Sequence, residues 1–233
     1  MSLVGRRVVA SSSVYREKTT LLIVAGGSSR RMGTDKLLLP VPPKEIPLVR
    51  HVAERLLPLA TNVIVIANDP GVCAVVRSLA QEAVRHGQDG MHAGTVVSCL
   101  QDDTPGEGPL GGLATGLRRI DGWALTVAGD MPFISAACCR FLIGRTGMGC
   151  DAVVPVVDGQ SQPLHAVYSR RCLPSVEKAM AAGKRRMDSF WNEVRVRLIP
   201  EEQLRAYDSD LLTFTNVNTP AEWKEARALL SQG

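Results

Sequence analysis

A stretch of glycine, serine and basic residues between positions 25 and 36 carries the residue types that bind a polyphosphate. It begins Ala-Gly-Gly-Ser-Ser and contains Arg31 and Lys36. Glycines let the backbone approach a ligand and leave N–H groups free to bind anions, while Arg offers a planar fork and Lys a compact charge. The spacing fits neither a P-loop nor a dinucleotide fingerprint. We therefore predict a different phosphate-binding loop, the alternative being a glycine-rich turn with solvated basic side chains.

Two further segments place carboxylates beside turn residues. Asp102 and Asp103 precede a Gly-Pro helix start at Gly108, and Asp130 is followed by Met-Pro. A loop acid beside glycines suits recognition of a base or ribose, although a turn with a helix cap uses the same residue types. A lone Asp after an apolar strand suits Mg²⁺, which usually takes one or two protein carboxylates plus substrate phosphates. We predict Mg²⁺ at Asp130, with a capping role as the alternative.

Amide and basic side chains gather in the C-terminal half. Asn216 and Asn218 stand at alternate positions, so an extended chain would put both amides on one face. That arrangement suits ligand contact or neutral metal ligation, and a turn capped by Thr219 is the alternative. A basic cluster after Gly183, for which a solvated helix end is the plain interpretation, consists of Lys184, Arg185 and Arg186.

Short apolar runs alternate with helix-like segments, which predicts a parallel sheet covered on both faces. The class is α/β, a Rossmann-like three-layer α/β/α fold with a mostly parallel sheet and an antiparallel strand in the C-terminal half. Ligands bind such sheets at the carboxyl ends of the strands, where the polar residues above are found. The predicted strands are 20–25, 62–67, 95–100, 123–128, 152–157, 164–168 and 194–199. The predicted helices are 46–59, 72–86, 108–120, 135–143, 173–182 and 220–230.

Composition narrows the class of protein without selecting a function. The chain has 233 residues, 45% of them hydrophobic and 4% aromatic, and its net charge is 27 − 23 = +4. These values exclude a fibre, a disordered chain and a disulfide scaffold, and the net charge is too small and too dispersed to imply a nucleic-acid surface. No apolar run is long enough for a membrane span. The six cysteines lack zinc or redox spacing, which favours buried thiols in a reducing cytoplasm. We expect a flexible tail over 1–18 and a single domain over 19–231.

The segment from Val24 to Lys36 resembles the signature loop of nucleotidyltransferases with the nucleotide-diphosphosugar transferase fold. The strings at 108–112, 130–132, 162–168 and 216–220 follow in the same order, and the whole set is similar to molybdenum cofactor guanylyltransferases over about residues 20–222. The resemblance implies transfer of GMP from GTP to the terminal phosphate of molybdopterin, with release of pyrophosphate. A phosphomonoester is largely ionised at neutral pH because its second pKa is about 6, so the reaction needs no general base.

The resemblance also implies a role for each matching residue. Lys36 and Arg31 match the cations on the phosphates and the departing pyrophosphate, and Asp130 matches the Mg²⁺ ligand. Asp102 best matches the acid that binds guanosine, with Asp103 left open by a one-residue ambiguity. The implied nucleotide-binding set is Val24, Ala25, Gly26, Gly27, Lys36, Asp102, Gly108 and Asp130. The implied acceptor-binding set is Asn216, Asn218, Lys184, Arg185 and Arg186.

Two departures and two rival functions accompany the resemblance. Residues 40–48 replace the family's compact turn, and we expect them to form a surface loop. The second strand ends Ile-Ala-Asn at 66–68, which leaves a side-chain contact from position 66 open. One rival is a cytidylyltransferase acting on molybdopterin or on a sugar or polyol phosphate. The other is a non-catalytic nucleotide-binding module, against which Lys36 and Asp130 argue. The implied product would pass to a molybdoenzyme or its chaperone in the cytoplasm.

Overall fold

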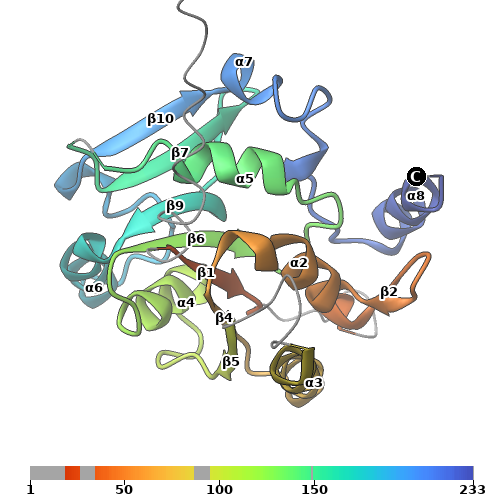
Figure 1. The fold of residues 1–233 in the computed structure, drawn as a ribbon. Helices are drawn as coiled ribbons and strands as arrows, with labels where there is room; N and C mark the ends of the chain where they lie inside the picture. Colours follow the sequence, from red (N-terminus) through yellow and green to blue (C-terminus); the bar gives the residue numbers. More distant parts are fainter. Residues whose placement is uncertain (1–18, 27–34, 87–94, 148, 233) are drawn as a thin grey trace, which may run out of the picture.

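A single eight-stranded sheet organises the part of the chain that the computed structural model describes, namely residues 19–26, 35–86, 95–147 and 149–232. The predicted tail over 1–18, Gly27 and Arg31 lie outside these residues. Figure 1 shows the sheet running through the molecule in the order β10-β7-β9-β6-β1-β4-β5, with β8 paired to β7. Its strands are β1 (Thr19–Val24), β4 (Asn62–Ile66), β5 (Val96–Leu100), β6 (Trp123–Ala128), β7 (Ala152–Val157), β8 (Gln160–Ser161), β9 (His165–Ser169) and β10 (Val196–Pro200).

The strand order reverses at β1. The chain moves from β1 outward through β4 to β5, and then returns to place β6 on the other side of β1. All of these pairings are parallel, whereas β9 is antiparallel to both β6 and β7. The predicted mostly parallel sheet with an antiparallel strand in the C-terminal half is therefore confirmed. The reversal of strand order at β1 is the position where open α/β sheets bind ligands.

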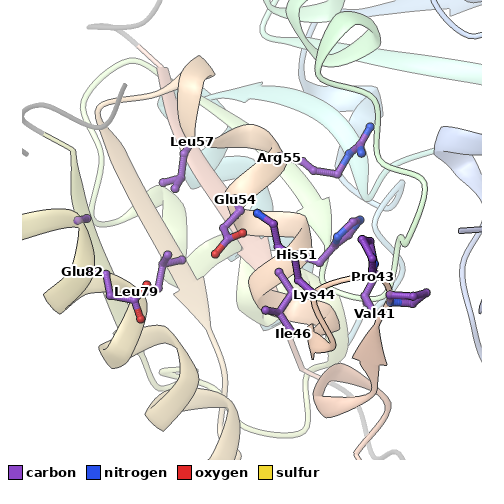
Figure 2. A pocket seen from close by; sticks show the side chains of 12 residues that line it. Val41, Pro43, Lys44, Ile46, His51, Glu54, Arg55, Leu57, Leu79 and Glu82 are labelled. Carbon is purple, nitrogen blue, oxygen red and sulfur yellow. The ribbon is translucent and has the colours of Figure 1, made fainter. Parts of the chain in front are cut away.

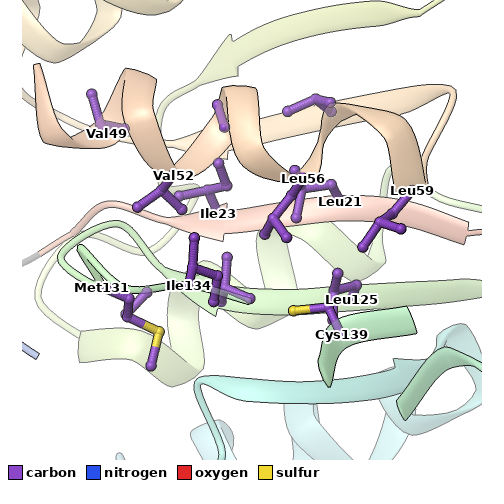
Figure 3. Packing of buried hydrophobic residues seen from close by; sticks show 14 of the residues in the cluster. Leu21, Ile23, Val49, Val52, Leu56, Leu59, Leu125, Met131, Ile134 and Cys139 are labelled. Carbon is purple, nitrogen blue, oxygen red and sulfur yellow. The ribbon is translucent and has the colours of Figure 1, made fainter. Parts of the chain in front are cut away.

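Helices cover both faces of the sheet because successive strand residues point to opposite sides. Leu21 and Ile23 of β1 face one core, and Leu22 and Val24 face the other. Figure 3 shows the first core, where α2 lies over β1 and β6. On this side are α2 (Leu48–Leu56), α3 (Pro70–His86) and α5 (Ala136–Ile143), with α8 (Pro220–Leu230) packed at the edge of the same core. On the opposite side are α4 (Gly108–Leu117) and α6 (Leu173–Ala181).

The segment after Lys36 corrects one expectation. Residues 40–48 are not a plain surface loop: β2 (Pro40–Val41) and β3 (Ile46–Pro47) pair in an antiparallel hairpin. Val41 is fully buried, and burial of this side chain anchors the hairpin to the core. The predicted helix over 46–59 accordingly begins at Leu48. The hairpin, α2 and α3 border a cavity of about 530 Å³, shown in Figure 2.

The cysteines and helices agree with the remaining structural expectations. All six cysteines are free thiols, and Cys138, Cys139, Cys150 and Cys172 are buried. Burial raises the pKa of Cys138 to about 12, which keeps that thiol protonated and unreactive at neutral pH. Among the described residues, no helix combines the length and apolar character that a membrane span requires. One short helix, α7 (Glu201–Leu204), has no counterpart among the predicted elements.

Candidate active site

Lys36 and Asp130 meet in an ion pair at the carboxyl ends of β1 and β6. Lys36 begins a short 3-10 turn, which Asp35 caps by accepting a hydrogen bond from the backbone N of Leu37 at 3.0 Å. Asp130 follows β6 by two residues, and its Oδ2 contacts Nζ of Lys36. The two side chains are 20% and 10% exposed. The pair is thus largely shielded from bulk water, although neither side chain is completely buried.

Two asparagines from the C-terminal segment complete this cluster. Nδ2 of Asn216 donates to Oδ1 of Asp130 at 2.9 Å, and Nζ of Lys36 donates to Oδ1 of Asn218 at 2.8 Å. The residue between them, Val217, donates its backbone N–H to the carbonyl of Asp130 at 3.1 Å. This backbone bond brings a segment from near the chain's end alongside the end of β6. Both amides therefore reach the same pair of charged groups.

A capping box at the start of α8 orders the same segment. Thr219 caps the helix by accepting from the backbone N of Glu222 at 3.2 Å, as the alternative interpretation of this segment proposed. The carboxylate of Glu222 in turn accepts from the backbone N–H groups of Asn218 and Thr219, at 2.6 and 3.1 Å. The cap therefore fixes the backbone from which Asn218 reaches Lys36. Helix capping and ligand contact are compatible roles here, because they use different residues.

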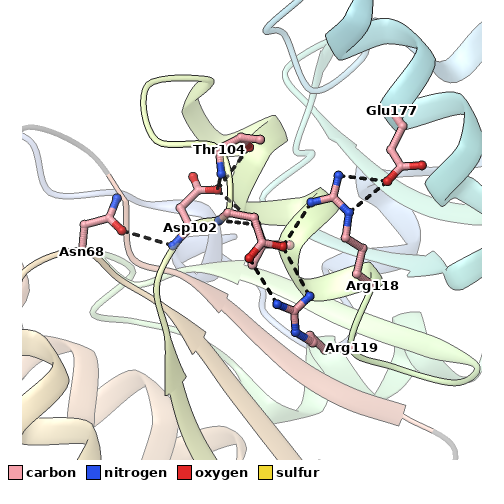
Figure 4. Close-up of polar contacts among 8 residues, drawn as sticks. Asn68, Asp102, Thr104, Arg118, Arg119 and Glu177 are labelled. Atoms are coloured by element: carbon pink, nitrogen blue, oxygen red, sulfur yellow. Dashed lines mark hydrogen bonds and ion pairs between the residues drawn. The ribbon is translucent and has the colours of Figure 1, made fainter.

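Asp102 occupies the corresponding place at the end of β5, as Figure 4 shows. Its backbone N donates to Oδ1 of Asn68 at 3.1 Å, which ties the ends of β5 and β4 together. Its Oδ1 accepts from the backbone N of Thr104 at 3.0 Å and from Oγ1 of Thr115 at 3.1 Å. The half-buried carboxylate is held in one orientation, and no bond to its Oδ2 occurs in the described part of the chain. Asp102 is thus a preorganised acceptor beside the N-terminus of α4.

Asp103 is engaged elsewhere. Its carboxylate forms ion pairs with Arg118 at 3.2 Å and Arg119 at 3.1 Å, the two arginines labelled in Figure 4. Partial burial raises the pKa of Asp103, but the hydrogen bonds from Arg119 and Arg118 outweigh it and hold the pKa below its usual range. A carboxylate committed to two arginines has less capacity to bind a nucleoside. The geometry therefore supports Asp102 over Asp103 as the nucleotide-binding acid.

Glycines at the start of α4 allow that helix to lie against the loop ends. Gly108 has φ +66° and an open side facing solvent. A Cβ at Gly111 would lie 2.8 Å from Oγ1 of Thr104 and 3.2 Å from Oδ2 of Asp102, and one at Gly112 would lie 3.0 Å from Val24. Larger residues would push the helix away from the carboxylate. Close packing of α4 against the candidate site therefore explains the glycines in the string over 108–112.

A cavity of about 380 Å³ opens beside the Lys36–Asp130 cluster, between the N-terminus of α4 and residues 160–164. Asn216 and Arg186 both line it, so one residue of the predicted asparagine pair and one of the predicted basic cluster border the same cavity. Its other lining residues include Met131, Gln162 and Asp188. Arg186 forms a two-bond ion pair with Asp188, at 3.0 and 2.7 Å.

The other two residues of the basic cluster lie differently. Arg185 pairs with Glu107 at 3.3 Å, at the start of α4. Lys184 is exposed and is not among the residues that line the cavity. Of the predicted acceptor residues, Asn216 and Asn218 contact the Lys36–Asp130 pair, and Arg186 lines the cavity that Asn216 also lines. Arg185 lies at the start of α4, and Lys184 contacts neither the pair nor the cavity lining in the described part of the chain.

The donor set around Asp130 fits one Mg²⁺ ion shared with a substrate. Among the described residues, no group of three or more His, Cys, Asp or Glu side chains could form a complete metal cage. Mg²⁺ is usually held by one or two carboxylates plus substrate phosphates and water, so a single carboxylate beside two amides suffices. Asp130 is the candidate ligand, and Lys36 would have to release its Oδ2.

Several contributors had weak or absent sequence signals. Asn68, Thr104 and Thr115 position Asp102, but each is a common loop or helix residue. Asn68 is identifiable only as a polar residue at the end of a predicted strand. Met131 stood in the Asp-Met-Pro string, yet nothing in that string indicates that it lines a cavity. These contacts depend on which loops become neighbours, and local sequence patterns do not contain that information.

Comparisons with known proteins agree with this geometry. Residues 21–197 match the MobA-like NTP transferase domain. The molybdenum cofactor guanylyltransferase of Desulfosudis oleivorans is 39% identical over 127 residues, which cover 54% of this chain and 63% of that protein. A probable molybdenum cofactor guanylyltransferase of Pelotomaculum thermopropionicum is 34% identical over 204 residues, covering 86% of this chain and 87% of that protein.

A solved structure extends the agreement to the fold. Molybdopterin-guanine dinucleotide biosynthesis protein A from Archaeoglobus fulgidus superposes with a TM-score of 0.71 at 26% identity. The superposition covers 92% of this chain and 100% of that one. With the family match spanning most of the sheet and both strand ends of the site, the chain belongs to the MobA-like NTP transferase domain family.

Proposed function

We propose that this protein transfers GMP from GTP to the terminal phosphate of molybdopterin, forming the guanine dinucleotide and pyrophosphate. The observation that carries the proposal is the meeting of Lys36, Asp130, Asn216 and Asn218 between two binding regions. One region is the Asp102 loop, and the other is the 380 Å³ cavity. The relatives named as molybdenum cofactor guanylyltransferases support this choice of nucleotide and acceptor.

The N-terminal half would bind the nucleotide. Val24, Ala25 and Gly26 lie at the end of β1, where backbone groups can approach the phosphates, and the backbone N of Ala25 is bonded to β4 at 2.9 Å. Asp102 would accept hydrogen bonds from the guanosine portion, because its carboxylate is fixed by its own neighbours. Gly27 and Arg31, outside the described residues, remain predicted contacts of the phosphates, and Gly108 remains a predicted nucleotide contact at the start of α4.

The C-terminal half would bind the acceptor. The cavity beside Asn216 is lined by both Met131 and Arg186, so it offers an apolar contact and a guanidinium group, the latter paired with Asp188. A pterin with a terminal phosphate presents a flat apolar body and an anionic end, which match these two kinds of wall. We assign Arg186 and the asparagine pair to acceptor binding, and Arg185 and Lys184 to the outer approach.

The chemistry requires positioning and charge neutralisation. A terminal phosphate oxygen of molybdopterin forms a bond to the α-phosphorus of GTP, while the bond from that phosphorus to the bridging oxygen breaks and pyrophosphate leaves. Lys36 is placed to neutralise phosphate charge, and the nucleophile is already ionised at neutral pH. Neither of the two His side chains described contacts the cluster itself: His51 contacts the carbonyl of Pro132, and His165 is buried in the core.

A divalent ion, which we propose to be Mg²⁺, would be held by Asp130. When bound, it would stabilise negative charge on the reacting phosphate oxygens and orient them. The protein's own contribution is the orientation of Asp130, fixed by Asn216 on one carboxylate oxygen and by Val217 on its backbone carbonyl. Fixed orientation is valuable because catalysis of phosphoryl transfer rests mainly on geometry.

We also propose that the protein works in the cytoplasm as a single nucleotidyltransferase domain over 19–231. The free thiols, two of them only half-buried, suit a reducing compartment. The labile product would then pass to a molybdoenzyme or its chaperone.

The decisive experiment supplies Mg²⁺, molybdopterin and each labelled NTP in turn, and measures dinucleotide and pyrophosphate. We expect turnover with GTP, and a loss of at least about 100-fold in rate for Lys36→Ala and Asp130→Ala. Matched controls are Lys224→Ala and Asp121→Ala, which remove the same charges from exposed positions outside the site. Preference for CTP would replace the proposal with a cytidylyltransferase. Nucleotide binding without turnover of any NTP would indicate a non-catalytic module.

A further inference from the structure

Helix α2 holds the segment that carries Asp130 through two side chains. Nε2 of His51 lies 2.9 Å from the carbonyl oxygen of Pro132, and Nε of Arg55 donates to the carbonyl oxygen of Ile134 at 2.7 Å. Residues four apart lie on one face of a helix, so both side chains address the same segment. The two carbonyls are two and four residues beyond Asp130. The contacts are thus made next to the candidate metal ligand but not to it.

The rest of the segment is held from other directions. The carbonyl of Asp130 accepts from the backbone N of Val217 at 3.1 Å, and the backbone N of Ser135 donates to Oγ1 of Thr213 at 2.9 Å. Pro132 has no N–H, so its carbonyl is the backbone group by which the segment can be held at that point. The C-terminal half therefore holds the segment at Asp130 and at the peptide group between Ile134 and Ser135, and α2 holds the carbonyl of that same peptide group and the carbonyl of Pro132.

The other sides of both side chains face the 530 Å³ cavity rather than packed core. Figure 2 shows His51 and Arg55 among the residues that line it, together with Lys44 of the hairpin. Shortening a side chain that already borders a cavity enlarges that cavity instead of creating an enclosed void. Replacing either residue should therefore remove its hydrogen bond to the segment while costing little packing.

The histidine must be in one tautomer to make its contact. Burial is the largest influence on the pKa of His51 and lowers it, so the ring is neutral at pH 7. A carbonyl can only accept a hydrogen bond, so the proton of the neutral ring must be on Nε2. The geometry thus defines the contact as an N–H donor to the carbonyl of Pro132, a property that glutamine shares and alanine lacks.

We propose that His51 and Arg55 are positioning residues for nucleotidyl transfer. By fixing the carbonyls of Pro132 and Ile134 from α2, they keep Asp130 oriented toward the cluster. This inference rests on the proposed function for its catalytic consequence, but the orientation of Asp130 also governs divalent-ion binding without any acceptor. Loss of either contact would let the segment shift, and small displacements of a catalytic group can reduce rates by about 100-fold.

The test compares non-donor with donor replacements. His51→Ala and Arg55→Met remove the contacts, and His51→Gln and Arg55→Lys retain an N–H donor. Lys44→Ala is the matched control, because Lys44 lines the same cavity and has no role in the candidate site. Three quantities are measured on each folded variant: the Mn²⁺ dissociation constant without substrates, by electron paramagnetic resonance, and kcat and KM for GTP.

We expect the two non-donor variants to bind Mn²⁺ about 3- to 10-fold more weakly and to lose about 10-fold or more in kcat, with KM for GTP changed less than kcat. The donor variants should recover most of both losses, and Lys44→Ala should match the parent protein. Equal behaviour of His51→Gln and His51→Ala would overturn the proposal, as would parent-like Mn²⁺ binding and kcat in both non-donor variants. If the parent protein does not transfer GMP to molybdopterin, the proposed function fails, and Mn²⁺ binding still decides the positioning role.

Discussion

Replacing Lys36 with methionine should affect ion binding and turnover in opposite directions. In the structure, the ammonium group of Lys36 contacts Oδ2 of Asp130 and donates to Asn218. A divalent ion at Asp130 must displace that ammonium group and also experiences its repulsion. Lys36→Met removes both obstacles while keeping an unbranched side chain. The variant protein should therefore bind a divalent ion more tightly than the parent when no nucleotide is present.

The size of the effect follows from how well the pair is shielded. Exposed ion pairs contribute about 0–1 kcal/mol, whereas removing one partner of a fully buried pair costs about 3–5 kcal/mol because the other charge is left unpaired. With side-chain exposures of 20% and 10%, the Lys36–Asp130 pair lies between these cases, and about 1–2 kcal/mol is a reasonable cost of breaking it. That cost corresponds to an affinity gain of about 5- to 30-fold. Turnover of GTP should fall by at least about 100-fold, because the same cation neutralises phosphate charge during transfer.

The assay titrates Mn²⁺ into protein without nucleotide and follows free ion by electron paramagnetic resonance, alongside the GTP transfer assay. Adding Asp130→Asn to the Lys36→Met protein should abolish the gain, which assigns the gain to this carboxylate. Mn²⁺ affinity that is unchanged or weaker in Lys36→Met would refute the reasoning. It would mean that Lys36 supports the ion site instead of competing for it.

Three further changes test the fold and the nucleotide region. Burial lowers the pKa of His165 to about 3, so between pH 7 and pH 5 the histidine is protonated in the unfolded chain but not in the folded one. The free energy of unfolding should therefore fall by about 2 kcal/mol as the pH falls from 7 to 5 because of this residue. In urea unfolding, His165→Leu should lack this part of the pH dependence. Gly116→Ala should lower stability by about 1–3 kcal/mol in thermal unfolding, because its Cβ would collide with Leu22, and an unchanged melting temperature would contradict the close packing of α4 on β1. Asp102→Asn should weaken GTP binding about 10-fold or more by calorimetry, whereas Asp103→Asn should stay within about twofold of the parent; the reverse order would reassign the nucleotide acid.

Much of the fold could be predicted because each element has its own local pattern. The strands over 123–128 and 152–157 and the helix over 220–230 have the predicted bounds, since continuous apolar runs and a Pro at the first helical turn mark them clearly. The β2–β3 hairpin was missed because two-residue strands are too short to show a period. Its stability comes from burial of Val41 in a core built by distant residues.

The candidate site divides in the same way. Lys36 and Asp130 follow predicted strands, and strand ends in a parallel sheet converge on one edge, so their proximity could be inferred once β1 and β6 were taken as neighbours. Which side chains hydrogen-bond to these residues could not be inferred from the sequence. Asn216 lies 86 residues from Asp130 in sequence, and Arg55 lies 79 residues from Ile134. Such contacts arise from packing between elements, which a local pattern does not specify.

The Asn216–Asn218 segment places its two amides together as predicted, but not for the predicted structural reason. Alternate spacing predicted that both amides share a face, and both do reach the Lys36–Asp130 pair, although the segment is not a strand. Its extended course is imposed at one end by the capping box of α8 and in its middle by the bond from Val217 to the carbonyl of Asp130. Removing the cap should therefore disturb the candidate site as well as the helix. The helix cap at Thr219 and the polar contacts of the two asparagines are therefore parts of one arrangement, in which helix capping supplies the rigidity that the amides need.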